Sequence, residues 1–155
     1  LSEENYDLLD EVIHQLCEQG RLLEEQNAMQ HGSTSVYEHS VNVAYKSLLL
    51  VENYRLPVDK QSLVRGALLH DYFLYDWHEK DGGHRLHGFR HPAFALYNAS
   101  KDFSLNRKER NIIARHMFPL TVLPPRCLEA WIVCFVDKYC AFSETMGDGR
   151  IQWER

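Results

Sequence analysis

An imidazole and a carboxylate stand side by side where His70-Asp71 follows an apolar run that ends at Leu69. Helical spacing from Leu63 places both groups on the stripe that would otherwise stay apolar. A buried carboxylate without a partner is costly, so the pair needs hydrogen bonds, an opposite charge or a metal ion. Imidazole nitrogen and carboxylate oxygen are good ligands for first-row divalent metals. For an isolated pair, the alternative is a satisfied core histidine beside a helix-ending aspartate.

Further histidines and acids occupy apolar settings elsewhere in the chain. His39 lies one turn before Val43 on an apolar helix face, and Asp137 continues the face of Val133 in the last apolar stretch. Six such residues form what we call the ligand set: His39, His70, Asp71, His91, His116 and Asp137. Four histidines and two carboxylates can hold two metal ions that share one carboxylate, and such a centre lowers the pKa of a shared water and clamps a phosphate.

The elements expected to position the ligand set are helical. An amphipathic stripe over residues 8–17 ends at Gly20, and a shorter helix is expected over 22–29. Capping boxes at Ser35-x-x-Glu38 and Asn106-x-x-Glu109 open the helices of His39 and His116. Asp59 can cap the helix that ends at the His-Asp doublet.

Prolines open the remaining helices, one at His91-Pro92 and the last major one at Pro124-Pro125. Between residues 72 and 90 the periodicity is lost, and a long irregular segment of this kind is typical of a lid or binding loop. No stretch shows the alternation of an exposed-face strand. The sequence therefore predicts an all-α fold, a single compact helical bundle of about six or seven helices that forms one domain over residues 1–155.

Composition limits the classes of function. The chain has 155 residues, 45% hydrophobic and 25% charged, as is ordinary for one globular domain. A net charge of −5 without a lysine/arginine block argues against a nucleic acid polymer or a membrane as partner. No apolar run reaches the length of a membrane span, and no secretory signal pattern opens the chain. The four cysteines show no C-x-x-C pair, so reduced thiols in a cytoplasmic protein are expected.

The order of the ligand set resembles that of the HD superfamily of metal-dependent phosphohydrolases, and the resemblance covers the chain from His39 to Asp137. In that family the first histidine, the doublet and the final aspartate hold one metal, which implies His39, His70, Asp71 and Asp137 here. Members with two further histidines bind a second metal. Those positions match His91 and His116, with Asp71 as the bridge. The resemblance implies an all-helical bundle and one or two divalent transition metal ions (Fe, Mn, Co, Ni or Zn).

Two departures separate this chain from known subgroups of the superfamily. The subgroup with His-Asp-Ile-Gly-Lys has a lysine three positions after the aspartate, where this chain has Leu74. The cyclic-dinucleotide phosphodiesterase branch has paired histidines and a Gly-Tyr-Pro motif, whereas His116 is followed here by Met117-Phe118-Pro119. The substrate of neither subgroup can therefore be assigned to this chain.

Several side chains near the ligand set are candidates for handling a substrate. Basic residues that can clamp a phosphate are Arg65, Arg90, Arg115 and Lys138. The candidate catalytic residues are Asp71, Lys138 and Arg115. The candidate substrate-binding residues, for which a solvated position is the alternative, are His31, His87 and Arg90. Tyr75 and Asp76 follow the doublet, where an acid for the leaving group would be useful.

Two functions fit these features. The first is a metal-dependent phosphohydrolase that acts on a small phosphorylated metabolite or nucleotide, with a metal-activated water as nucleophile. The second is a non-catalytic metal- or nucleotide-binding HD module that serves as a sensor or docking domain. The complete ligand set favours the first, and the missing lysine after the doublet gives the second some support. Substrate, native metal and oligomeric state do not follow from the sequence.

Overall fold

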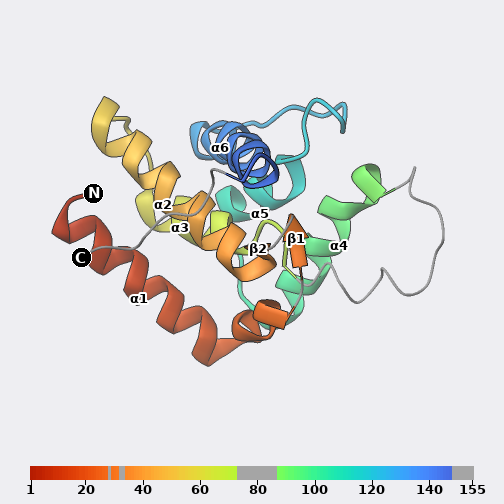
Figure 1. The fold of residues 1–155 in the computed structure, drawn as a ribbon, viewed down its shortest axis with the longest axis horizontal. Coiled ribbons are helices and arrows are strands. Elements are labelled where there is room, and N and C mark those ends of the chain that lie inside the picture. The colour runs from red at the N-terminus through yellow and green to blue at the C-terminus, as the bar shows by residue number, and fades with distance from the viewer. Residues whose placement is uncertain (28, 32–33, 73–86, 148–155) are drawn as a thin grey trace.

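The computed structural model describes residues 1–27, 29–31, 34–72 and 87–147, with the side chains of 27, 29–31 and 87–89 left out of that description (Figure 1). Within these ranges there are six α-helices: α1 (Glu3–Gln19), α2 (Val36–Tyr54), α3 (Lys60–Leu69), α4 (His87–Asp102), α5 (Arg107–Arg115) and α6 (Leu128–Thr145). A 3-10 helix η1 (Leu22–Asn27) and two short strands, β1 (Met29–His31) and β2 (Thr34–Ser35), complete the described elements. The predicted all-α fold is confirmed.

Three helices begin where a side chain caps the backbone. The hydroxyl of Ser35 accepts from the backbone N of Glu38 at 3.2 Å, and the Glu38 carboxylate accepts from the backbone N of Ser35 at 2.9 Å. Asn106 and Glu109 form the same reciprocal pair at α5, and the carboxylate of Asp59 caps α3. These N-termini are confirmed as predicted, and they set the start of the helices that lead to the ligand set.

Three boundaries differ from the prediction, and one of them is the start of α6, which lies at Leu128 and not at Pro124-Pro125. Helix α4 begins at His87, about one turn before the expected start at His91, so Pro92 lies inside the helix. Proline favours a first turn, but its fixed φ is compatible with a helix at the cost of one hydrogen bond. The expected helix over 22–29 is only the 3-10 turn of η1. Met29 instead pairs antiparallel with Ser35, in a ladder too short for strand alternation to appear in the sequence.

The central helices are α2, α3, α5 and α6, with α1 along one edge and α4 along another (Figure 1). Helix α3 is the most enclosed of them. Its Leu63, Val64, Ala67, Leu68 and Leu69 are all fully buried. Helices α1, α2, α5 and α6 pack against α3, and α3 delivers the His-Asp doublet into the interior. No helix in the described part of the chain is long and apolar enough to cross a membrane.

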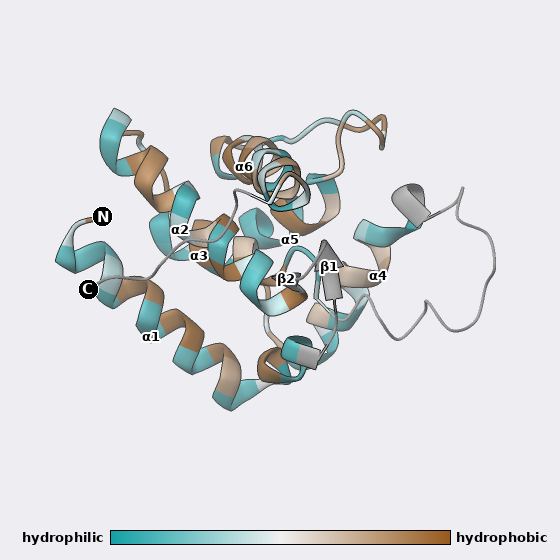
Figure 2. Cartoon of the chain, viewed as in Figure 1, coloured by the Kyte–Doolittle hydropathy of each residue, from teal (hydrophilic) through white to brown (hydrophobic). Residues whose placement is uncertain are grey.

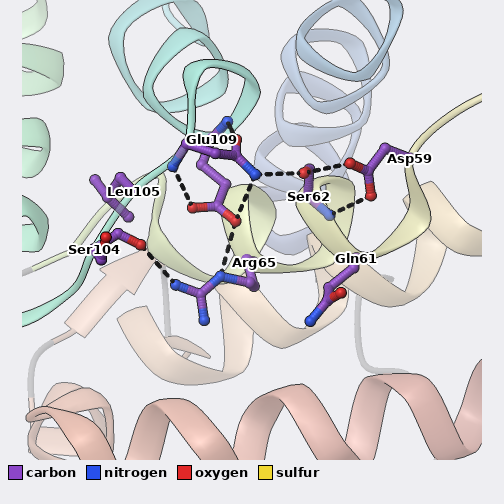
Figure 3. A pocket seen from close by; sticks show the side chains of 8 residues that line it. Asp59, Gln61, Ser62, Arg65, Ser104, Leu105 and Glu109 are labelled. Atoms are coloured by element: carbon purple, nitrogen blue, oxygen red, sulfur yellow. Dashed lines mark hydrogen bonds and ion pairs between the residues drawn. The ribbon is translucent and has the colours of Figure 1, made fainter.

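Helices α3 and α5 run in the same direction, since contacts pair their N-terminal ends, their middles and their C-terminal ends. Figure 3 shows the hydrogen bonds that join the N-terminal ends. The side-chain amide of Asn106 donates to the hydroxyl of Ser62 at 2.8 Å. Arg65 Nε donates to the buried carboxylate of Glu109 at 2.8 Å, and its Nη2 donates to the Ser104 carbonyl. Because Arg65 is paired here, one of the predicted phosphate clamps is used for holding two helices together.

The same two helices come very close further along. A Cβ built on Gly66 would lie 2.4 Å from Cδ1 of Ile112, well inside van der Waals contact. At the C-terminal ends, the ring centroids of His70 and His116 are 4.9 Å apart. The parallel alignment of α3 and α5 therefore brings two histidines of the ligand set to one end of the pair.

Candidate metal centre

His39, His70 and Asp137 meet in what we call the first triad. They come from the first turn of α2, the C-cap of α3 and the middle of α6. Asp137 Oδ1 lies 3.0 Å from His39 Nε2 and 3.4 Å from His70 Nε2. All three residues are buried, and their candidate ligand atoms lie within 4.8 Å of one another. Two imidazoles and a carboxylate at this spacing can hold one divalent metal ion.

Asp71, His91 and His116 form a second triad. Asp71 Oδ1 lies 2.5 Å from His91 Nε2 and 3.2 Å from His116 Nε2, and the two nitrogens are 3.1 Å apart. Asp71 and His116 are buried, whereas His91 is half-buried. The second triad is therefore the more accessible of the two, and it too can hold one metal ion.

Asp71 lies between the two triads and presents a different oxygen to each. Its Oδ1 faces His91 and His116. Its Oδ2 lies 3.4 Å from His70 Nε2 and 4.0 Å from His39 Nε2 in the first triad. A carboxylate with this orientation can bridge two cations, the arrangement found in two-metal hydrolytic sites.

Helix ends fix the orientation of two imidazoles. His70 Nδ1 donates to the Ala67 carbonyl at 2.6 Å, and His116 Nδ1 donates to the Ile113 carbonyl at 2.8 Å. Carbonyls of a last helical turn lack helical partners, so a C-cap histidine can satisfy one of them. With the proton on Nδ1, a neutral ring presents the Nε2 lone pair to the triads. Buried His70 Nε2 has no hydrogen-bond partner among the described residues, which fits a place for a metal ion.

Glu144 belongs to the centre although the sequence analysis did not identify it. Its Oε2 lies 2.8 Å from Nδ1 of His39, and its Oε1 accepts from the side-chain amide of Asn42 at 2.9 Å. Glu144 comes seven residues after Asp137 on α6, a spacing that puts both on one helix face. This seven-residue spacing is the sequence feature from which Glu144 could have been identified. Glu144 acts as an outer partner that orients His39, as carboxylates do for metal-binding histidines.

Electrostatics in the centre favour a charged His39 and a charged Asp71. Burial lowers the pKa of His39, but hydrogen bonds to Asp137 and Glu144 outweigh it and raise the pKa to about 10. Burial raises the pKa of Asp71, yet the charges of His70 and His91 hold it well below its usual range. Burial lowers the pKa of His116, and the contact with Asp71 only partly offsets this. A cation at either triad would thus replace protons that neutralise the carboxylates.

A family model described as the HD domain matches residues 36–141, which include the whole ligand set. The chain belongs to the HD-domain family. No curated protein and no solved structure matches it significantly. HD domains are typically metal-dependent phosphohydrolases, and the two His/Asp triads are consistent with a binuclear HD centre.

The basic residues predicted near the HD centre have different positions in the structure. Lys138 Nζ donates to the carbonyls of His116 at 2.7 Å and Cys134 at 3.1 Å, so it caps α5 instead of facing the triads. Arg115 is half-buried and Arg90 is exposed, and neither forms an ion pair with a described residue. A catalytic role for Lys138 requires it to leave these carbonyls and, like that of Arg115, stays a prediction.

The remaining predicted contacts of the HD centre cannot be placed in full. His31 ends β1 and His87 begins α4, but their side chains lie outside the description. Leu74, Tyr75 and Asp76 fall outside the described residues altogether. Substrate binding by His31, His87 and Arg90 therefore stays a prediction.

Proposed function

We propose that this HD domain is a phosphohydrolase that acts on a small phosphorylated metabolite or nucleotide, with a metal-activated water as the nucleophile. The observation that carries the proposal is the position of Asp71. One of its oxygens faces each triad, and each triad contains a C-cap histidine whose Nδ1 is held by a backbone carbonyl and whose Nε2 faces Asp71. An aspartate with only a structural role would not need histidines of both triads around its two oxygens.

The donor set fits two divalent transition metal ions. The first triad with Asp71 Oδ2 would hold one ion, and the second triad with Asp71 Oδ1 would hold the other. When bound, such ions lower the pKa of a coordinated water and polarise phosphoryl oxygens. Nitrogen and carboxylate donors without thiolate suit Fe, Mn, Co, Ni or Zn.

The protein side chains would contribute orientation and exclusion of water. His39, His70 and His116 are fully or almost fully buried, so bulk water is kept from the inner ligands. The half-buried His91 marks the side from which a substrate can approach. Glu144 fixes the ring of His39, and the Ala67 and Ile113 carbonyls fix those of His70 and His116. Rings held in place in this way lose little freedom when they bind a cation.

Charge on the described surface supports a small substrate. Arg90 precedes His91 and is exposed, so its guanidinium is available to pair with a phosphate. The net charge of −5 and the lack of a lysine/arginine block in the sequence argue against a polymer as substrate. All four cysteines are free thiols, in keeping with a protein of the reducing cytoplasm.

Purified protein, analysed for bound metal and then screened against phosphomonoesters, nucleotides and cyclic dinucleotides, tests the proposal. We expect metal in the protein and metal-dependent release of phosphate or of a nucleoside monophosphate from one class of substrate. Metal binding without turnover of any class, together with saturable nucleotide binding, would support a sensor or docking module. Protein that binds none of Fe²⁺, Mn²⁺, Co²⁺, Ni²⁺ and Zn²⁺ would contradict the phosphohydrolase.

A further inference from the structure

Helix α6 has two faces with opposite chemistry. Its buried face carries Asp137 and Glu144 of the metal centre. Its outer face is apolar, and we call the following residues the outer stripe: Leu128, Trp131, Phe135, Tyr139, Phe142 and Met146, the residue after the helix. All except the half-buried Trp131 are exposed, Phe135, Tyr139, Phe142 and Met146 by 62–67%. Figure 2 shows the hydrophobic character of α6 and of the segment before it.

No charged side chain of α6 faces solvent beside this stripe. Glu129, Asp137 and Glu144 are buried, and Lys138 is half-buried with its ammonium on backbone carbonyls. The outer face of a solvent-exposed helix normally carries the charged residues, and a helix that is apolar all round is normally buried. The outer stripe therefore has the composition of a covered surface.

The exposed area matches that of a protein interface. With about 150–250 Å² for each complete large side chain, the outer stripe exposes about 600 Å². Leu120, Val122 and Leu123, in the segment that leads into α6, are also exposed, and together with the stripe they reach about 900 Å². Phe118 of that segment packs edge-on against Trp131. A stable interface needs about 800 Å² from each partner, and the largest apolar patch on a monomer is typically about 300–600 Å².

The order of residues along the stripe is self-complementary. Tyr139 lies in the middle, Phe135 and Phe142 lie one turn to either side, and Trp131 and Met146 lie about two turns to either side. If two α6 helices cross antiparallel at Tyr139, then Phe135 meets Phe142 of the other copy and Trp131 meets Met146. Both are favourable contacts, one between aromatic rings and one between sulfur and a ring. A two-fold interface requires this kind of match between a surface and itself.

We propose that the outer stripe is the interface of a homodimer in which two α6 helices pack antiparallel about Tyr139. Lys46 of α2 places its Nζ 4.7 Å from the centre of the Tyr139 ring and lies at the edge of this interface. Since α6 also carries Asp137 and Glu144, dimerisation covers the outer side of the helix whose inner side builds the metal centre. Nothing in the ligand set is exchanged between the copies.

Sedimentation velocity over a wide range of protein concentration tests the proposal. We expect the wild type to sediment as a dimer. Phe135→Glu combined with Phe142→Glu should make it a monomer, with the dimer dissociation constant raised about 100-fold or more. The matched control is Tyr97→Glu, which changes an exposed aromatic residue of α4 and should leave the dimer intact. Circular dichroism checks that each variant is folded.

A second measurement does not depend on a charged substitution. Tyr139→Cys should be joined to the same residue of the other copy by a short bismaleimide, whereas Tyr97→Cys should show no more cross-linking than the four native cysteines do. A wild type that is monomeric at all concentrations would overturn the proposal, even if it bound lipid vesicles. So would a double variant that remains dimeric, because the dimer would then use another face.

Discussion

Gly66 and Ile112 set the spacing of the two helices that end at the metal centre. A Cβ on Gly66 would come within 2.4 Å of Ile112 Cδ1 and 3.0 Å of its Cβ and Cγ2. Because Ile112 is fully buried, its side chain has little space into which it can move. The close contact lets the C-caps His70 and His116 meet, and it explains why the position has no side chain.

Gly66→Ala should therefore push α3 and α5 apart. We expect a loss of stability of about 1–3 kcal/mol from overpacking, and weaker metal binding because His70 and His116 separate. Thermal melts of the metal-free protein and titration with Mn²⁺ or Zn²⁺ measure the two effects. Gly20→Ala is the matched control, since its Cβ would meet the Phe103 ring at 2.3 Å, away from the centre. Equal losses of metal affinity in both variants would refute a special role for the α3–α5 contact.

His91→Ala should lower the metal stoichiometry from two towards one without unfolding the protein. His91 is half-buried and belongs only to the second triad, whereas the first triad keeps all three of its residues. Metal analysis after gel filtration measures the stoichiometry, and circular dichroism monitors the fold. Unchanged stoichiometry would mean that His91 is a helix residue without a role in metal binding.

Much of this arrangement follows from hydrophobic periodicity. His39, His70 and Asp137 interrupt apolar stripes, and an apolar stripe faces the interior whatever the details of packing. Their convergence could thus be predicted before any distance was known. The capping boxes at Ser35 and Asn106 predicted two helix starts for a similarly local reason.

Other features depend on tertiary contacts that periodicity does not contain. Neighbours on a helix point about 100° apart, so the position of Lys138 beside Asp137 did not reveal that its ammonium reaches back to the carbonyls of His116 and Cys134. Glu144 lies at the end of α6, where an acid is normally solvated, and only the approach of His39 from α2 makes it an inner residue. Local signals also favoured Pro92 as a helix start, while α4 extends one turn further.

Glu144→Gln should weaken metal binding by about 10–100-fold while the fold is kept, because it removes the charged partner of His39 Nδ1. Competition with a metal indicator measures the affinity. Glu129→Gln is the matched control on the same helix. Glu129 is also buried, but it pairs with Lys108 and with the backbone N of Asp59. That control should lose stability and keep its metal affinity. If Glu144→Gln kept its metal affinity while Glu129→Gln lost it, Glu144 would not belong to the metal centre.

Acid should loosen the attachment of α1 through Glu52. Hydrogen bonds from the backbone N of Ser2 and from the Asn5 amide lower the pKa of Glu52 to about 2. A carboxyl group with a lowered pKa stabilises the fold above its unfolded value of 4.5, and that contribution is lost as the pH falls from there towards 2. Urea unfolding of metal-free protein between these pH values should show a steeper decline for the wild type than for Glu52→Gln. If the free energy of unfolding declined equally in both proteins, Glu52 would not be the source of the acid sensitivity.

Asp71→Asn gives the most direct test of the bridge. The substitution keeps the size of the side chain and removes the charge that faces both triads, so metal binding should drop at both positions and hydrolysis should disappear. A buried aspartate with only a structural role predicts something else, namely a modest change in stability and an unchanged metal content.

Thermal melts with and without a chelator separate these cases for Asp71. Bound metal stabilises only the form that binds it, by about 2.7 kcal/mol at a hundredfold excess over the dissociation constant. The chelator should therefore lower the midpoint of the wild type and leave that of Asp71→Asn where it is. If it lowers both midpoints equally, Asp71 is not the bridge. If it lowers neither, the two triads hold no metal, and the proposed phosphohydrolase activity cannot arise from them.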